Sequence, residues 1–103
     1  MSKYIRLMAD FCSDAVWDEN GASVDINSLP IHHWLKNMID DWQAWYDREG
    51  FDDNFDLDLF GKHGFALAVK LKQNLPDWTI MYFNESKIQE GKSRSEALKE
   101  IIL

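Results

Sequence analysis

The stretch that decides the fold is SLPIHHWLKNMIDDWQAWYDREG, residues 28–50. Its apolar side chains recur at the i, i+3, i+4, i+7 spacing of one helical face, and they are Ile31, Trp34, Leu35, Met38, Ile39, Trp42, Trp45 and Tyr46. This face fills an arc of roughly 140°, so we expect it to pack against a sheet or several partners. We expect Ser28 to cap the helix, Pro30 to lie in its first turn, and Gly50 to end it in the left-handed conformation.

A second helix is predicted to run to about Asn74, where Pro76 stops it. Gly61 and Gly64 each cost about 1 kcal/mol relative to alanine inside a helix. They therefore either allow another element to approach closely or mark a later start of the helix. The apolar row of this helix consists of Leu57, Phe60, Gly64, Leu67, Ala68, Leu71 and Leu75.

Two strands and a hairpin turn are predicted before the first helix. Alternating apolar residues in 3–11 indicate a half-buried strand. The pair Asn20-Gly21 favours a type I′ turn, since both of its central residues need positive φ. Pairing outward from that turn sets Trp17 opposite Val24 in a hairpin.

The C-terminal part supplies a strand and a short helix. Residues 77–84 are apolar on both alternating sets, which predicts a central strand covered on both faces. Ser93 and Glu96 have the spacing of a capping box and predict a helix of roughly ten residues. The element order predicts an α+β fold for residues 1–103. We expect a single two-layer domain with a small, mostly antiparallel sheet, two main helices and a short C-terminal helix.

The composition is that of an ordinary globular protein, with 46% apolar and 28% charged residues in 103. Cys12 is the single cysteine, so no internal disulfide is expected, and the first residues lack the charged, apolar and small-residue pattern expected of a secretory signal. A reducing cytoplasm is therefore the expected compartment. No apolar run approaches the ~20 residues that a membrane span needs.

Negative charge is concentrated in one half of the chain. Residues 10–58 hold thirteen acidic and two basic residues, a net charge of −11, while the whole chain carries −7. This excess disfavours direct nucleic-acid binding, which needs a basic footprint, and favours a basic protein partner. Simple solubility would explain scattered carboxylates. Asp40 and Asp47 lie on the free face of the first helix and residues 49–58 follow directly, so we expect these charges to be concentrated in space. The candidate partner-binding residues are Asp40, Asp47, Glu49, Asp52, Asp53, Asp56 and Asp58.

A calcium loop is the first alternative for this acidic run. Asp52, Asn54 and Asp56 match ligand positions one, three and five of an EF-hand. Position six, which needs glycine, is Leu57, and position twelve, which needs glutamate, is His63. We therefore expect no metal site and no cofactor.

Catalytic signatures are also missing. The three histidines have no partner at metal-ligand spacing, and adjacent His32 and His33 point about 100° apart on a helix. Cys12 has no activating or oxyanion signature around it. We therefore expect that the protein is not an enzyme. An exposed aromatic beside the carboxylates would make a good interface anchor, although the sequence does not identify which aromatic is exposed.

Several stretches resemble a set of small bacterial proteins, some of which are immunity proteins of contact-dependent growth inhibition systems. They are residues 4–10 (YIRLMAD), 16–18 (VWD), 29–30 (LP), 64–68 (GFALA) and 75–78 (LPDW). The likeness spans most of the chain in order and carries no catalytic residues. It implies a cytoplasmic protein that binds and neutralises the toxic C-terminal domain of a delivered toxin, often a nuclease.

Two other classes of function fit the same sequence. A non-catalytic regulatory or adaptor module that binds a different basic protein would show the same acidic half. A small enzyme using Cys12 or the histidines is the less favoured alternative.

Overall fold

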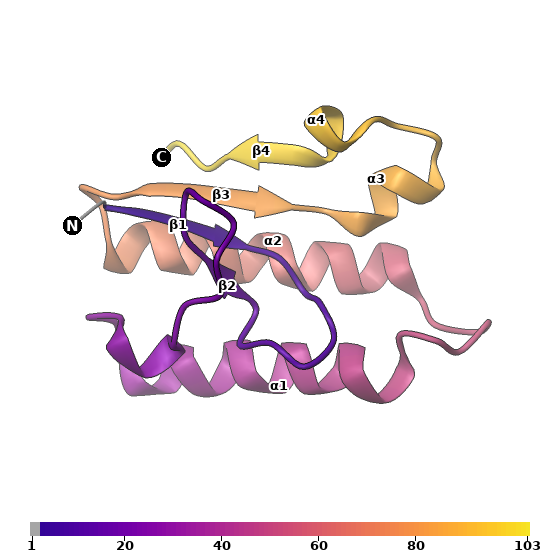
Figure 1. The fold of residues 1–103 in the computed structure, drawn as a ribbon, viewed down its shortest axis with the longest axis horizontal. Helices are drawn as coiled ribbons and strands as arrows, with labels where there is room; N and C mark the ends of the chain where they lie inside the picture. The colour runs from indigo at the N-terminus through magenta and orange to yellow at the C-terminus, as the bar shows by residue number, and fades with distance from the viewer. Residues whose placement is uncertain (1–2) are drawn as a thin grey trace.

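The computed structural model describes residues 3–103, apart from the side chain of Gln89. In Figure 1 the elements follow one another from β4 at the top through β3, β1 and α2 to α1 at the bottom. The fold is α+β, as predicted, with two long helices packed side by side. The elements are β1 (Tyr4–Leu7), β2 (Val16–Trp17), the 3₁₀ turn η1 (Ile26–Ser28), α1 (His33–Glu49), α2 (Leu57–Asn74), β3 (Thr79–Phe83), α3 (Glu85–Gln89), α4 (Arg94–Ala97) and β4 (Leu98–Glu100).

The four strands form one mixed sheet in the order β2-β1-β3-β4. The β1–β2 and β3–β4 pairs are antiparallel and the central β1–β3 pair is parallel. Parallel neighbours need a long crossover connection, and here the segment containing both α1 and α2 supplies it. The sheet is therefore mostly antiparallel, and β3 lies in its interior as predicted.

The two faces of the sheet differ in burial. Ile5 and Leu7 of β1, and Ile80 and Tyr82 of β3, are at most 2% exposed. Their alternates Tyr4, Arg6, Thr79 and Met81 are half-buried. Only one face is thus fully covered, whereas the sequence predicted cover on both faces of β3.

Helix α2 has the predicted apolar row, and every member of it is buried. Asp56 caps its N-terminus by accepting a hydrogen bond from the Leu59 backbone N–H at 3.0 Å. A Cβ at Gly64 would collide with Tyr82 and Trp42, and one at Gly61 would collide with Asn84. The close-approach alternative for these glycines is therefore correct.

The start of α1 differs from the prediction. The helix begins at His33, and its N-cap His32 makes no side-chain capping bond. Ser28 instead ends the 3₁₀ turn, which Asp25 caps. Gly50 has φ −61° and is right-handed; the Phe11 ring lies so close that a Cβ there would sit 3.1 Å from it.

The apolar face of α1 is narrower than the sequence suggested. Leu35, Ile39, Trp42 and Tyr46 are buried, Ile31 and Trp45 are half-buried, while Trp34 and Met38 are 47% and 40% exposed. Gln43, a polar residue, takes a buried place beside them. Its amide donates to the Asp10 carbonyl at 2.6 Å and to the Asp47 carboxylate at 3.0 Å, which satisfies it there.

The predicted type I′ turn is wrong. Gly21 has positive φ but Asn20 does not, and Trp17 bridges Ser23 instead of Val24. The Asp18 carboxylate accepts hydrogen bonds from the Asn20 and Ala22 backbone N–H groups, which stabilises a wider loop.

The C-terminal prediction is half right. Ser93 and Glu96 form the full capping box, but the helix has only one turn, Arg94–Ala97. The next residues form β4, which pairs with the otherwise open edge of β3. The short helix α3 was not predicted. Within the described residues, none of the helices has the length and apolar character needed to cross a bilayer.

Candidate protein-binding surface

Asp40 and Asp47 of α1 lie beside the loop that follows β1. Asp47 accepts hydrogen bonds from the Gln43 amide at 3.0 Å and the Cys12 backbone N–H at 3.4 Å. Burial, followed by the nearby charges of Asp14 and Asp41, raises the pKa of Asp40. The loop therefore adds carboxylates to the charge on this side of α1.

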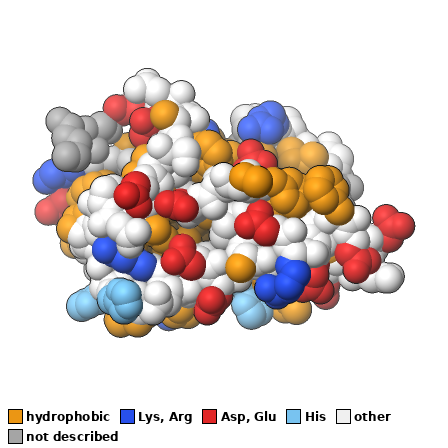
Figure 2. All heavy atoms as spheres, turned by 60° about the horizontal axis from the view of Figure 1, so that its bottom comes forward, with side chains coloured by type: hydrophobic (Ala, Val, Ile, Leu, Met, Phe, Trp, Pro, Cys, Tyr) orange, Lys and Arg blue, Asp and Glu red, His pale blue; other side chains and the backbone are white. Residues whose placement is uncertain are grey.

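Carboxylates are spread along the face that α1 presents. Figure 2 shows acidic side chains there as separate groups, with apolar side chains exposed between them. Dispersed charge of this kind does not form a chelating centre. It gives an extended negative surface with apolar contact area.

The loop between α1 and α2 forms a second acidic group. Asp52 and Asp53 line a polar hollow of about 380 Å³ together with Glu85, the first residue of α3. Phe51 and Phe55 also line it, and none of the described lining residues is basic. The structure thus brings Asp52 and Asp53 together with a carboxylate from a distant part of the sequence.

Five of the seven predicted site residues have hydrogen-bond or ion-pair partners: Asp47, as described above, Asp52, which accepts from the Asn54 backbone N–H, and Glu49, Asp56 and Asp58. Asp56 caps α2, as described above. Asp58 pairs with Lys62 at 3.3 Å, and Glu49 pairs with Arg48 at 3.7 Å, all four side chains being well exposed. Exposed pairs of this kind contribute about 0–1 kcal/mol, so they leave these carboxylates accessible to a stronger partner.

An ordered aromatic stack projects from this end of the molecule. Phe51 is 85% exposed, and its ring lies parallel to Phe11 at 4.3 Å between centroids. Phe11 in turn packs on the buried Tyr46 at 4.6 Å. The Tyr46 hydroxyl donates to the Glu85 carboxylate at 2.9 Å, which joins α1 to α3.

Several neighbours influence the pKa of the Glu85 carboxylate. Partial burial raises its pKa, and the charge of Asp10 adds to that effect. The hydrogen bond from Tyr46 opposes it by stabilising the ionised form, and Arg94 acts in the same direction. Burial and the Glu85 charge raise the pKa of Tyr46, which keeps its hydroxyl protonated as a donor.

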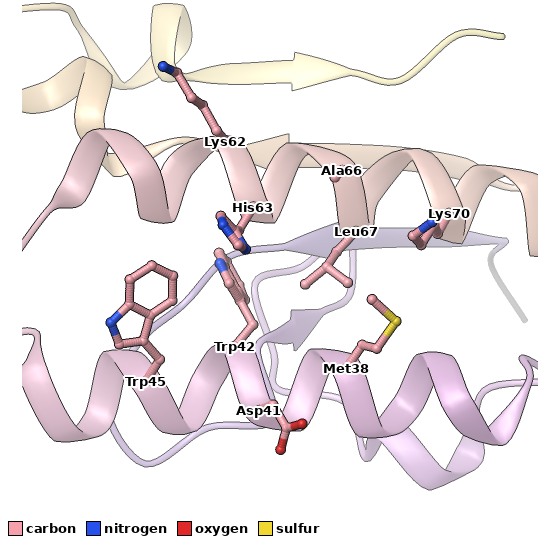
Figure 3. Close-up of a pocket in the computed structure, with 9 residues that line it drawn as sticks. All are labelled: Met38, Asp41, Trp42, Trp45, Lys62, His63, Ala66, Leu67 and Lys70. Atoms are coloured by element: carbon pink, nitrogen blue, oxygen red, sulfur yellow. The ribbon is translucent and has the colours of Figure 1, made fainter.

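A separate groove of about 440 Å³ runs between α1 and α2. In Figure 3 Trp42, Trp45 and Met38 extend from α1 toward α2, and Leu67 extends from α2 toward α1. Asp41, Lys62, His63 and Lys70 are its polar and charged lining residues, so it carries both signs of charge. It differs in this respect from the acidic hollow around Asp52 and Asp53.

The described residues contain no group of three or more His, Cys, Asp and Glu side chains placed to hold a metal ion. In the suspected calcium loop, Asp52 accepts from the Asn54 backbone N–H and Asp56 caps α2, so both carboxylates serve the local backbone. Cys12 is exposed, and His63 lies edge-on to Trp45 at 5.6 Å.

Sequence reasoning missed four residues of this surface: Asp10, Asp14, Phe51 and Glu85. Asp10 and Asp14 belong to the acidic half, but no local pattern says that their loop folds back on α1. Glu85 lies outside that half altogether. The sequence did contain a signal for the exposure of Phe51, because this residue begins the acidic run and directly follows a helix-ending glycine.

Comparison with known proteins bears on this surface. The family described as Serratia CdiI immunity protein-like matches residues 3–85, from β1 to the start of α3. No curated protein is similar enough to the chain to count as a match. Because the family match covers more than half of the chain and agrees with the resemblance in its sequence, the chain belongs to the Serratia CdiI immunity protein-like family.

Proposed function

We propose that this chain is an immunity protein that binds and neutralises a cognate, basic, nuclease-type toxin domain without catalysis of its own. It acts in the cytoplasm as a single domain, with no cofactor and with no direct contact to nucleic acid or membrane. Family membership supports the immunity role. The binding surface is acidic and consists of Asp40, Asp47, Glu49, Asp52, Asp53, Asp56 and Asp58, all of them exposed or half-buried.

The observation that carries the proposal is the charge of residues 10–58, a net −11. A nuclease needs a basic surface because its substrate is a polyanion. Carboxylates spaced along a complementary surface occupy that site and exclude the nucleic acid. They also raise the rate of association, which matters when a toxin must be captured before it turns over.

The first experiment is co-expression of the chain with the toxin domain encoded beside it. We expect cell growth to be restored and a stable complex to be recovered by size-exclusion chromatography. Toxicity that persists with both proteins present would refute the immunity role. Capture of a different basic protein in place of the toxin would identify the chain as an adaptor.

The same assay tests the enzyme alternative. A variant with Cys12→Ser and all three histidines changed to Gln removes the nucleophile and base candidates, none of which has a buried side chain. Full protection by this variant is expected for a stoichiometric inhibitor. Loss of protection with a retained fold and retained binding would point to catalysis.

A pair of charge-reversed variants tests the surface. Within residues 3–103 the side chains of Asp40 and Asp53 take part in no hydrogen bond or ion pair, so Asp40→Lys with Asp53→Lys changes charge with little structural cost. The control, Asp77→Lys with Glu100→Lys, changes the net charge equally at exposed positions elsewhere. We expect the first pair to slow association about tenfold at low salt and the control to change it far less. Equal effects of the two pairs would refute the assigned surface.

A further inference from the structure

Phe51 is the most exposed large apolar side chain of the described residues, at 85%. It lies in the connection between α1 and α2, directly before Asp52 and Asp53. Exposed aromatic rings enclosed by a polar rim are the side chains that most often dominate protein interfaces. The acidic residues alone do not explain why this large apolar side chain is exposed.

The ring is held in place before any partner arrives. One face lies against Phe11, with an angle of 6° between the two ring planes. Phe11 is fixed by Tyr46 beneath it and by the close backbone of Gly50, and Tyr46 is anchored to Glu85 by its hydroxyl. An ordered ring loses little conformational entropy on binding. The other face of the Phe51 ring is left as a platform.

Carboxylates lie beside this platform. Asp52, Asp53 and Glu85 line the hollow beside it, and Asp10 lies close enough to raise the pKa of Glu85. A second copy of this chain would bring like charges together here, which disfavours self-association. A cationic group is the complement of both features, because it is attracted to the face of an aromatic ring and to carboxylates.

Building on the proposed function, we propose that Phe51 is the anchor for an arginine side chain of the toxin. The guanidinium lies flat on the open ring face and reaches Asp52 or Asp53 at the edge of the hollow. Arginine fits this site better than lysine, since its planar group stacks on a ring while its N–H groups pair with a carboxylate. The carboxylates attract the toxin, and the Phe51 ring holds it after contact.

The test is the binding of Phe51→Leu and Phe51→Trp variants to the purified toxin domain by biolayer interferometry. Leucine keeps an apolar side chain without a ring, whereas tryptophan keeps the ring. We expect Phe51→Leu to raise Kd about tenfold, mainly through faster dissociation, and Phe51→Trp to change it less than about threefold. The control Ile102→Ala removes a 79% exposed apolar side chain elsewhere and should leave Kd unchanged.

A double-mutant cycle identifies the partner residue. Each toxin arginine is changed to alanine and measured against both wild type and Phe51→Leu. We expect a coupling of about tenfold with one arginine and additivity with the others. Additivity with every arginine would overturn the proposal.

The two proposals fail differently. Suppose that wild type binds the toxin, and that the Asp40→Lys, Asp53→Lys double variant slows association. If Phe51→Leu then binds as tightly as wild type, the anchor proposal is wrong and the immunity function stands. If wild type does not bind the toxin, both are overturned. Circular dichroism of each variant confirms that it is folded.

Discussion

Replacing Gly64 with alanine tests how α2 is held between α1 and the sheet. Helix propensity alone predicts stabilisation by about 1 kcal/mol, because alanine is the better helix former. The structure predicts the opposite sign. A Cβ at position 64 would collide with the Tyr82 hydroxyl and with the Trp42 ring.

Neither neighbour can move freely. Tyr82 donates a hydrogen bond to the Gly61 carbonyl at 2.8 Å, and Trp42 donates one to the Phe60 carbonyl at 3.1 Å. Overpacking costs about 1–3 kcal/mol, and a buried hydroxyl pushed off its acceptor costs about 1–3 kcal/mol more. After the gain in propensity, we expect Gly64→Ala to lower the free energy of unfolding by about 3 kcal/mol.

Urea unfolding followed by tryptophan fluorescence measures this change, and thermal unfolding should show a fall in Tm of roughly 12–20 °C. Tyr82→Phe removes the hydroxyl that the new methyl meets. The double variant should therefore be about 1–2 kcal/mol more stable than the sum of the single effects predicts. A Gly64→Ala variant as stable as wild type would refute the close packing of α2.

Two further predictions concern a helix cap and pH. Asp56→Ala should lower the free energy of unfolding by about 1 kcal/mol because α2 loses its N-cap. Asp58→Ala should lower it less, since the Asp58–Lys62 ion pair is exposed. Urea titration of both variants compares the two changes. The folded-state pKa of Glu85 is raised above 4.5, so the folded state binds more protons than the unfolded state between 4.5 and that higher value. Stability should therefore fall as pH rises through this window, and Glu85→Gln should reduce the fall in a series of urea titrations from pH 4 to 8. If the stability of Glu85→Gln depended on pH as that of wild type does, Glu85 would not be the source of this pH dependence.

The sequence predicted best where one strong local pattern had no competitor. Helix α2 has a long apolar row and Pro76 after its end, and both agree with the structure, whereas its N-cap Asp56 was not predicted. Its glycines could not be assigned a neighbour from sequence, since Tyr82 and Asn84 reach them from β3 and the residue after it.

Local patterns failed where tertiary contacts competed with them. Residues 98–100 follow a capping box, so the sequence predicts that they extend the helix. In the structure their backbone groups pair with the open edge of β3 instead. Trp34 and Met38 fit the helical period of α1, yet only part of that face meets the core. Gln43 shows the reverse case, because the Asp10 carbonyl, in a loop distant in sequence, accepts a hydrogen bond from its buried amide.

The candidate surface was predictable in composition and not in shape. An acidic half follows directly from residue counts, so the seven carboxylates could be named from sequence. Contacts over 30 or more residues decide which of them share a surface, as between Cys12 and Asp47 or between Tyr46 and Glu85. Such contacts leave no trace in local spacing.

The most direct test of the central claim is the association rate with the toxin domain as a function of salt concentration. If the acidic surface captures a basic toxin, the rate for wild type should fall steeply as salt rises. Asp40→Lys with Asp53→Lys should flatten this dependence, while the control with Asp77→Lys and Glu100→Lys should keep it. A wild-type rate that does not respond to salt, or an equal flattening by both pairs, would contradict the account.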